Sequence, residues 1–219
     1  MDNLVKICGL STPETLDAAL SAGADMVGFV RYPKSPRHVS LNLGHRLALQ
    51  AKGRAQRVVL LVNPGDEDIA QAVEAINPDL IQLHGSETPQ RVAEIRSMVK
   101  RPVMKALGVA APSDLQALSP YAGADHILLD AKPPRTANAL PGGNGVSFDW
   151  GLLNGLDRKV SFMLSGGLNP DNVAEAIRLT KTQAVDVSSG VESGPGLKDP
   201  ARIEAFIRAA RTAFAAARH

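Results

Sequence analysis

Cysteine and aromatic residues are scarce in this sequence, and each scarcity excludes a class of site. With one cysteine in 219 residues, Cys8, the chain can form no internal disulfide and no metal cluster held by several thiolates. Aromatic residues make up 4% of the chain, too few to suggest a base-stacking surface for single-stranded nucleic acid. Cys8 is therefore either a small buried residue or a reactive thiol.

Blocks of like charge and long apolar runs are also missing. The 24 basic and 22 acidic residues are scattered along the chain, so no patch suggests a nucleic-acid partner. No stretch approaches the roughly 18 apolar residues that cross a membrane, and residues 1–6 lack the pattern of a secretion signal. We therefore expect a cytoplasmic protein that contacts neither membrane nor nucleic acid.

Short apolar runs recur along the chain, and their starts lie about 20 to 35 residues apart, the rhythm of strand–helix units. The eight runs are Val5–Ile7, Met26–Phe29, Val58–Leu61, Leu80–Leu83, Val103–Ala106, Ile127–Leu129, Val160–Leu164 and Ala184–Val187. Helix starts are marked by a capping residue before proline at Thr12-Pro13, Thr88-Pro89, Asn169-Pro170 and Asp199-Pro200. The length fits one α/β domain over residues 1–219.

An internal echo favours a closed (β/α)₈ barrel over an open, doubly wound sheet. Ala22-Gly23-Ala24-Asp25 precedes the second run and Ala122-Gly123-Ala124-Asp125 precedes the sixth, an offset of half a barrel. An open sheet with a dinucleotide site would carry a glycine-rich fingerprint after the first strand, where Cys8-Gly9-Leu10-Ser11 stands instead.

Polar residues at the ends of the predicted strands are the candidates for chemistry, because barrel active sites lie at the carboxyl ends of the strands. The candidates are Cys8, Arg37, His84, Asp130 and Asp186. Each alone could be structural, as core filler, a helix cap or a surface charge. The last two strands end in Ser165-Gly166-Gly167 and Ser188-Ser189-Gly190, and glycine-rich turns at these positions are the usual phosphate seat of the fold. A small phosphorylated substrate is therefore expected.

Ordered motifs along nearly the whole chain resemble the phosphoribosylanthranilate isomerase family. They are Val5-Lys6-Ile7-Cys8-Gly9, Gly23-Ala24-Asp25-Met26-Val27-Gly28-Phe29, Ser35-Pro36-Arg37-His38-Val39-Ser40, Ile81-Gln82-Leu83-His84-Gly85, Leu128-Leu129-Asp130, Gly142-Gly143-Asn144-Gly145 with Phe148-Asp149-Trp150, Leu164-Ser165-Gly166-Gly167-Leu168, and Val185-Asp186-Val187-Ser188-Ser189-Gly190-Val191-Glu192. The resemblance implies an aldose–ketose isomerase of tryptophan biosynthesis.

By this resemblance, Asp130 is the general acid that opens the sugar ring and Cys8, as thiolate, is the general base. Arg37 holds the anthranilate carboxylate, and His84 and Asp186 lie at the substrate. Gly166, Gly167, Ser189 and Gly190 bind the phosphate. No metal or organic cofactor is implied. The apolar run before Asp130 is expected to desolvate its carboxyl and favour the protonated form, whereas Lys6 favours the Cys8 thiolate if the strand ends so as to bring them together.

Three other interpretations stay open at this point. Indole-3-glycerol-phosphate synthase would carry a helical extension before the first strand. Phosphosugar epimerases and the histidine-pathway isomerase use paired aspartates or metal-binding histidines rather than a cysteine at the first strand end. A barrel without activity could act as a binding subunit, since fold alone confers no activity.

We expect a monomer, with a homodimer as the alternative. Residues 131–140 match no family motif and are predicted to form a mobile loop over the barrel mouth.

Overall fold

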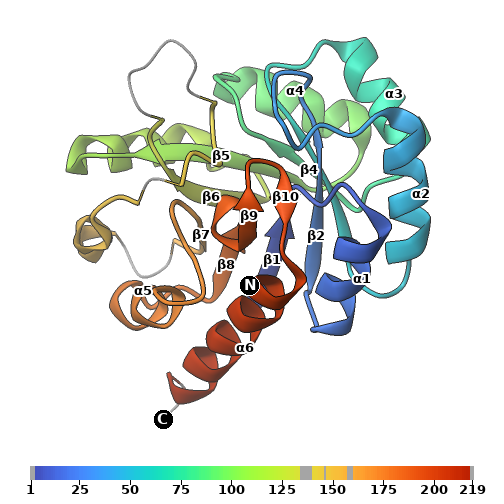
Figure 1. The fold of residues 1–219 in the computed structure, drawn as a ribbon. Coiled ribbons are helices and arrows are strands. Elements are labelled where there is room, and N and C mark those ends of the chain that lie inside the picture. The colour runs from blue at the N-terminus through green and yellow to red at the C-terminus, as the bar shows by residue number, and fades with distance from the viewer. Residues whose placement is uncertain (1–2, 134–139, 146, 157–159, 218–219) are drawn as a thin grey trace.

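The core of the protein is a closed barrel of eight parallel strands, in which each strand pairs with the next and β1 pairs with β8 (Figure 1). The computed structural model describes residues 3–133, 140–145, 147–156 and 160–217. The strands are β1 (Leu4–Cys8), β2 (Met26–Arg31), β3 (Gln56–Leu61), β4 (Leu80–Leu83), β5 (Val103–Val109), β6 (His126–Ala131), β7 (Met163–Leu164) and β8 (Ala184–Val187). The (β/α)₈ barrel predicted from the sequence is confirmed, and each predicted run overlaps one of the eight strands.

Helices follow most strands and form the outer layer. They are α1 (Pro13–Ser21), α2 (Leu41–Ala51), α3 (Asp66–Ile76), α4 (Pro89–Val99), α5 (Val173–Thr180) and α6 (Pro200–Ala216). The starts predicted at Thr12, Thr88 and Asp199 are confirmed, since each of these side chains accepts a hydrogen bond from the first turn of its helix. Helix α5 begins later than predicted. The Oδ1 of Asn169 accepts from the backbone of Asp171 and Asn172, which closes a turn before the helix.

Three segments differ from the regular alternation that the sequence suggests. In the described residues, the connections after β5 and β6 contain the 3₁₀ helices η1 (Pro112–Tyr121) and η2 (Trp150–Gly155). Pro120 lies inside η1 and lacks the N–H that an α-helix would need there. The seventh strand is shorter than the run predicted over residues 160–164. After β8 the chain forms η3 (Ser189–Val191) and a hairpin of β9 (Glu192–Gly194) and β10 (Leu197–Lys198) before α6.

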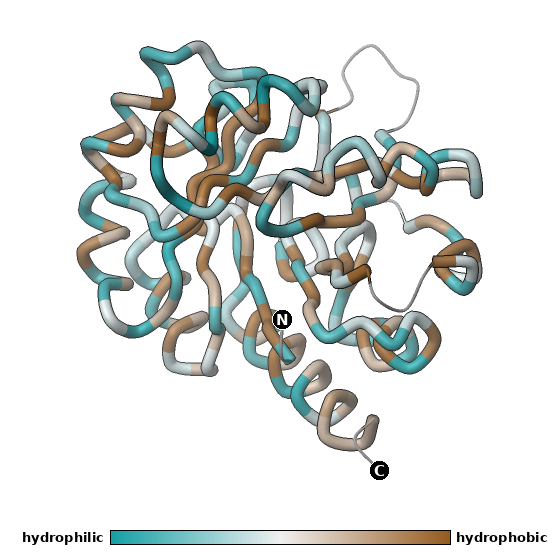
Figure 2. Tube along the Cα trace, turned by 180° about the vertical axis from the view of Figure 1, so that it is seen from behind, coloured by the Kyte–Doolittle hydropathy of each residue, from teal (hydrophilic) through white to brown (hydrophobic). Residues whose placement is uncertain are grey.

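Strand alternation divides the buried side chains into two layers. One set, which includes Val5, Ile7 and Phe29, packs between barrel and helices. The other fills the barrel interior with Met26, Val58, Leu80, Met104, Ala106, Leu128, Met163 and Ala184. In Figure 2 the hydrophobic strands accordingly lie inside helices of mixed colour. This apolar plug fills the lower barrel, so polar side chains that point inward meet only near the carboxyl ends of the strands.

Three aspartates close the opposite end of the barrel and explain the internal echo. Each stands just before an even-numbered strand and accepts a hydrogen bond from the backbone of the preceding odd-numbered strand. The contacts are Val5 N to Asp25 Oδ2 at 2.6 Å, Arg57 N to Asp79 Oδ2 at 2.8 Å and Val103 N to Asp125 Oδ2 at 2.9 Å. The repeated Ala-Gly-Ala-Asp sequence therefore joins pairs of strands, a role in stability rather than chemistry.

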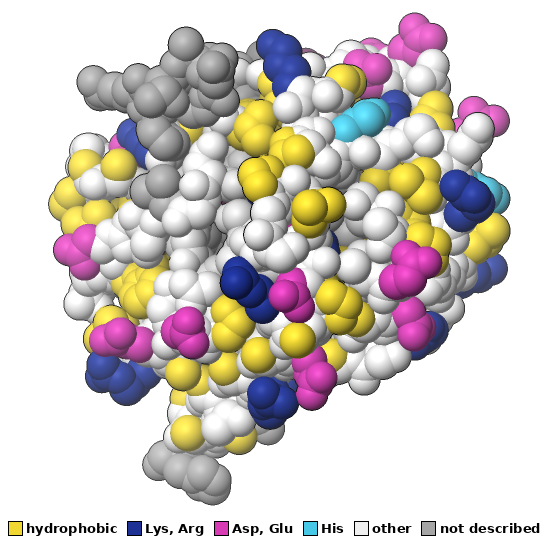
Figure 3. All heavy atoms as spheres, in the orientation of Figure 1, with side chains coloured by type: hydrophobic (Ala, Val, Ile, Leu, Met, Phe, Trp, Pro, Cys, Tyr) yellow, Lys and Arg dark blue, Asp and Glu magenta, His cyan; other side chains and the backbone are white. Residues whose placement is uncertain are grey.

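The outer surface carries both signs of charge. On the face shown in Figure 3, basic and acidic side chains are interspersed. Several exposed charges of the molecule form ion pairs, such as Arg208 with Glu204. Among the described residues, no helix has both the length and the apolar character needed to cross a membrane.

Candidate active site

A pocket opens at the carboxyl ends of the strands, and seven of the eight strands or the residues just after them line it. It encloses about 770 Å³ of empty space including its open mouth. The candidate residues Cys8, Arg37, His84, Asp130, Asp186, Gly166, Gly167 and Ser189 all line this pocket. The structure thus brings together eight of the nine predicted site residues, from segments distant in the sequence. The ninth, Gly190, borders an adjoining groove.

Cys8 and Lys6 point into the barrel from β1, because residues two apart on a strand share a face. Both side chains are buried. Burial raises the pKa of the Cys8 thiol above its ordinary value, and the Lys6 ammonium beside it offsets part of that rise. A Cβ atom at Gly28, on the adjacent strand, would lie 2.9 Å from Cys8 Sγ and 3.3 Å from Lys6 Nζ. The glycine therefore leaves the space in which thiol and ammonium meet.

The Lys6 ammonium also forms a buried ion pair across the β1–β8 pairing. Its Nζ lies 2.8 Å from Asp186 Oδ1, and Ser165 Oγ donates to Asp186 Oδ2 at 3.1 Å. Burial alone would lower the pKa of Lys6, but the Asp186 carboxylate and Cys8 together more than compensate, so that the pKa is raised and the amine stays protonated. Asp186 is thus held by two side chains inside the pocket, and each of its oxygens already accepts a hydrogen bond.

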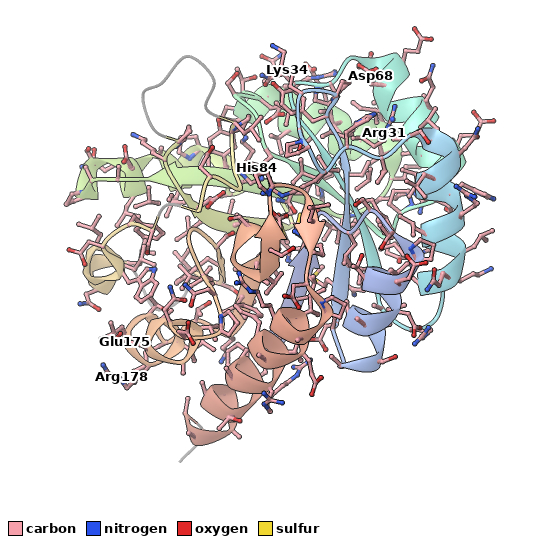
Figure 4. All side chains as sticks on the ribbon, viewed as in Figure 1. Arg31, Lys34, Asp68, His84, Glu175 and Arg178 are labelled. Atoms are coloured by element: carbon pink, nitrogen blue, oxygen red, sulfur yellow. The ribbon has the colours of Figure 1, made fainter. Side chains whose placement is uncertain are left out.

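Asp130, at the end of β6, pairs with His84 from the turn after β4. Asp130 Oδ2 lies 3.1 Å from His84 Nε2, and Oδ1 accepts from the backbone of Ala131 at 2.8 Å. A Cβ atom at Gly142 would come within 2.5 Å of His84 Nε2, so a glycine is required where this loop crosses the pair. His84 lies near the middle of the view in Figure 4, whereas the labelled charges of Asp68 and Glu175 lie at the periphery.

Arg37 is held by an acidic residue that sequence analysis gave no role. Glu192 of β9 accepts from Arg37 Nε at 2.7 Å and from Nη2 at 2.8 Å, and Nη2 also donates to the carbonyl of Gly143 at 3.2 Å. Lys198 of β10 donates to the same carboxylate at 2.6 Å and to the backbone of Ser188 at 2.9 Å. Two cations share one carboxylate, which leaves a net positive charge at this side of the pocket.

The glycine-rich turns after β7 and β8 lie next to each other at the pocket edge. Gly166 and Gly167 have φ values of +84° and +65°, a backbone that side chains with a Cβ rarely adopt. Gly190 packs against the carbonyl of Leu168, so a Cβ there would clash with the backbone. Gly190 therefore joins the two turns and, with Gly167 and Ser189, borders the adjoining groove.

The opposite side of the pocket is apolar. Val30 and Leu60 form a small cluster with Cys8, and the partly buried Tyr32 and Val62 pack against it. All five residues line the pocket. A ligand with an apolar ring at one end and an anion at the other matches this division of the pocket.

Sequence analysis missed several of the side chains that shape the site. Gln82 lines the pocket from within β4. Glu192 and Lys198 lie in the β9–β10 hairpin, where the sequence has no apolar run that would predict a strand. The family motifs contained Gln82 and Glu192, but nothing in their local spacing indicated a role. Of the predicted loop over residues 131–140, positions 134–139 lie outside the described residues, while Ala131, Lys132 and Leu140 line the pocket. Within the described residues, no cluster of three or more histidine, cysteine or acidic side chains could hold a metal ion.

Comparisons with known proteins agree with one another. Residues 5–209 match the family described as N-(5'-phosphoribosyl)anthranilate (PRA) isomerase. The chain is 57% identical over 215 residues to N-(5'-phosphoribosyl)anthranilate isomerase of Azorhizobium caulinodans, which covers 98% of this chain and 94% of the relative. The crystal structure of phosphoribosyl anthranilate isomerase from Thermotoga maritima superimposes with a TM-score of 0.86 at 39% identity, covering 97% and 100% of the two chains.

A further solved structure bears on the ligand. It is a phosphoribosyl anthranilate isomerase in complex with reduced 1-(o-carboxyphenylamino)-1-deoxyribulose 5-phosphate, with a TM-score of 0.84, 37% identity, and 97% and 100% of the two chains covered. The barrel, the pocket at its carboxyl end and the match along nearly the whole length lead to one conclusion. The chain belongs to the N-(5'-phosphoribosyl)anthranilate isomerase family, the enzymes that catalyse an aldose–ketose isomerisation in tryptophan biosynthesis.

Proposed function

We propose that this chain converts N-(5-phosphoribosyl)anthranilate to 1-(2-carboxyphenylamino)-1-deoxyribulose 5-phosphate, with Asp130 as general acid and Cys8 as general base. The observation that carries the assignment is that both side chains, from strands β6 and β1, line one pocket. An Amadori rearrangement needs one group to give a proton and another to take one. Neither step calls for a metal or an organic cofactor, and we propose that the chain uses none.

Asp130 starts the reaction in this scheme. Its carboxylic acid gives a proton to the furanose ring oxygen as the bond from that oxygen to the first sugar carbon breaks. The nitrogen lone pair forms the new C=N bond, which yields an open-chain Schiff base and leaves Asp130 as a carboxylate. The His84 ring, 3.1 Å from Asp130 Oδ2, then stabilises this carboxylate by a hydrogen bond.

Cys8 acts on the next carbon. Its thiolate takes the proton from the second sugar carbon, the electron pair of that C–H bond forms a C=C bond, and the C=N electrons return to nitrogen. The resulting enol becomes the ketose by proton shift. Because burial raises the pKa of Cys8, the thiol form is favoured in the ligand-free protein. Once formed, the thiolate is a stronger base than an exposed one, and Lys6 stabilises its charge.

The two sides of the pocket suggest how the substrate lies. The anthranilate ring packs against Val30 and Leu60, and its carboxylate meets Arg37. Since Glu192 occupies the Nε–Nη2 edge of the guanidinium, the substrate carboxylate binds end-on at Nη1, which lies beneath Gly143.

The remaining candidates bind the other parts of the substrate. The phosphate binds at the turns of Gly166, Gly167, Ser189 and Gly190, opposite the apolar side. Asp186, on the floor of the pocket, faces the substrate amine. His84, which lines the pocket beside Asp130, also contacts the substrate.

We further propose that residues 1–219 act as one domain, because the pairing of β1 with β8 joins the two ends of the barrel. The small-molecule phosphosugar is the partner that this site supports. A cytoplasmic location and a monomeric state remain predictions from the sequence.

The experiment that tests the assignment follows the loss of phosphoribosylanthranilate fluorescence in wild type, Cys8→Ser and Asp130→Asn. Loss of a positioned acid or base costs about 10²–10⁴ in rate, so kcat should collapse in each variant while circular dichroism stays native. The wild-type pH profile of kcat/KM should show two limbs, and Asp130→Asn should lose the limb of the acid only. Near wild-type turnover in either variant would remove that residue from its role, and a fully inactive wild type would favour the binding-subunit interpretation.

A further inference from the structure

Gln82 is a polar side chain enclosed by an apolar layer of the barrel. It lies on β4 in register with Leu60 of β3 and Met104 of β5, and it is fully buried. Burying an amide costs free energy unless its polar atoms are hydrogen-bonded. A leucine or methionine would fill the same space, so the position needs an explanation based on hydrogen bonding.

Only one half of the Gln82 amide has a partner. Its Nε2 lies 3.0 Å from His84 Nδ1, whereas Oε1 is buried and, within the described residues, has no hydrogen-bond donor. Three side chains therefore form a chain of contacts that ends at the proposed general acid: Gln82 to His84 at 3.0 Å, and His84 to Asp130 at 3.1 Å. The amide lies at the far end of this chain.

The orientation of the amide determines where the proton on the His84 ring lies. A neutral imidazole has one N–H, so when Gln82 donates to Nδ1 that proton is on Nε2. The ring then donates to Asp130 Oδ2, and Oδ1 already accepts from the Ala131 backbone. Both oxygens accept hydrogen bonds, an arrangement that stabilises the carboxylate of Asp130 and not the acid.

Rotating the amide by half a turn produces the opposite arrangement. Because Oε1 has no partner among the described residues, the rotation breaks no second hydrogen bond. Gln82 Oε1 then accepts a hydrogen bond from an N–H on His84 Nδ1. His84 Nε2, now without a proton, accepts a hydrogen bond from the carboxylic acid of Asp130. His84 carries one N–H in both arrangements. The arrangement with the rotated amide holds one more proton, the one on the Asp130 carboxyl. This proton is taken from water and later given to the sugar ring oxygen.

We propose that Gln82 is a positioning residue whose side-chain amide selects the tautomer of His84 and thereby the acid or carboxylate form of Asp130. The inference rests on the proposed role of Asp130. It concerns proton placement rather than movement of the ring, because the turn that bears His84 is fixed. Lys105 donates to the carbonyl of Gly85 and to the carboxylate of Glu87, each at 2.7 Å.

The other charged and titratable groups around the pocket have their own partners or lie on other strands. Lys6 pairs with Asp186, Arg37 with Glu192 and Lys132 with Asp114. Cys8 lies on β1, on the apolar side of the pocket. Within the described residues, the His84 ring forms hydrogen bonds with the side chains of Gln82 and Asp130. The amide is therefore the group that distinguishes the two ring nitrogens.

The test compares Gln82→Met, which removes donor and acceptor, with Gln82→Glu, whose carboxylate can only accept. Nitrogen NMR of histidine-labelled protein, with the His84 signals assigned from a His84→Gln sample, reports the tautomer without any activity. We expect the Nε2–H form in wild type, a loss of that preference in Gln82→Met, and an N–H on Nδ1 in Gln82→Glu. Gln71→Glu, on the exposed face of α3, controls for the added charge.

Kinetics provide the second measurement. In Gln82→Glu the kcat/KM limb that reports the acid should move to higher pH by about one unit or more, because the added carboxylate favours the extra proton. Gln82→Met should lose roughly tenfold or more in kcat with little change in KM. Unchanged His84 signals in both folded variants would overturn the proposal. Altered His84 signals with an unmoved limb would support Gln82 and instead contradict the role of Asp130.

Discussion

Glu192 accepts two hydrogen bonds along one edge of the Arg37 guanidinium, with its carboxylate oxygens 2.7 Å from Nε and 2.8 Å from Nη2. The contact joins the loop after β2 to the hairpin after β8, residues 155 positions apart. Burial would raise the pKa of Glu192, but Arg37 and Lys198 together lower it below the usual carboxyl value. The carboxylate therefore stays charged at neutral pH and fixes the direction in which Arg37 presents Nη1.

The first prediction concerns substrate binding by this pair. Arg37 contacts the substrate carboxylate in the bound state, before any proton moves. Arg37→Met removes this contact, so KM should rise more than kcat falls. Glu192→Gln keeps the shape but frees the guanidinium to turn, and should raise KM by a smaller factor. Steady-state kinetics on both variants check this. An unchanged KM with a lost kcat in Arg37→Met would place the residue in the chemistry instead.

The second prediction concerns the lower end of the barrel. Asp79 accepts from the backbone and side chain of Arg57 at 2.8–2.9 Å, and the Arg57 hydrogen bond lowers the pKa of Asp79. A carboxyl group whose pKa is lower in the folded than in the unfolded state stabilises the protein at any pH above its unfolded-state pKa. This stabilisation is lost as the pH falls through the folded-state pKa. Asp79→Asn should cost about 1–2 kcal/mol at pH 7, discounted for partial exposure, and less near pH 3.

Urea unfolding at the two pH values measures this difference. Asp17→Asn is the matched control, since it breaks an exposed pair between α1 and Arg54 in the turn after α2, worth about 0–1 kcal/mol. Activity at pH 7 should remain in both variants because neither residue lines the pocket. A destabilisation of Asp79→Asn equal to that of the control would show that the repeated aspartates do not hold the strands together.

Local sequence patterns predict the barrel well because its signals are local. Apolar runs mark strands buried on both faces, and Thr12, Thr88 and Asp199 cap the helices that follow them. The 3₁₀ segments were missed because their helical spacing is short and weak. Asn169 misled the prediction of a helix start because the same side chain also closes a turn.

The site was predicted in part for the same reason. Residues at strand ends can be found by position, and Cys8 and Asp130 do line one pocket. The partners that set their chemistry cannot be found in this way. Glu192 reaches Arg37 across 155 positions, and Lys6 reaches Asp186 across 180. Strand alternation puts Lys6 and Cys8 on one face of the first strand, but whether the ammonium reaches the thiol, and how far it offsets burial, follows from the packed structure.

The last prediction separates the charge of Lys6 from its structural role. Lys6→Met alone leaves the Asp186 carboxylate buried without its cation, which typically costs about 3–5 kcal/mol and can unfold the protein. The double variant Lys6→Met with Asp186→Asn removes both charges and should fold. Of the two, the Lys6 ammonium has the larger influence on Cys8: it lowers the pKa of the thiol, while Asp186 raises it by less. Removing both should therefore raise the Cys8 pKa further.

Alkylation by iodoacetamide measures this directly, because Cys8 is the sole cysteine and the thiolate is the reactive form. The rate in wild type should rise with pH around a midpoint above the ordinary thiol value of about 8.5, and in the double variant the midpoint should lie higher still. Cys8→Ser provides the unreactive blank, and circular dichroism verifies the fold. In the double variant kcat/KM at pH 7.5 should fall, because fewer thiolates are present and because the Asp186 carboxylate no longer faces the substrate amine. The part of the loss that is due to the thiolate should recover as the pH rises. Identical midpoints in the two proteins would show that Lys6 does not stabilise the thiolate and that its role is to pair with Asp186 alone.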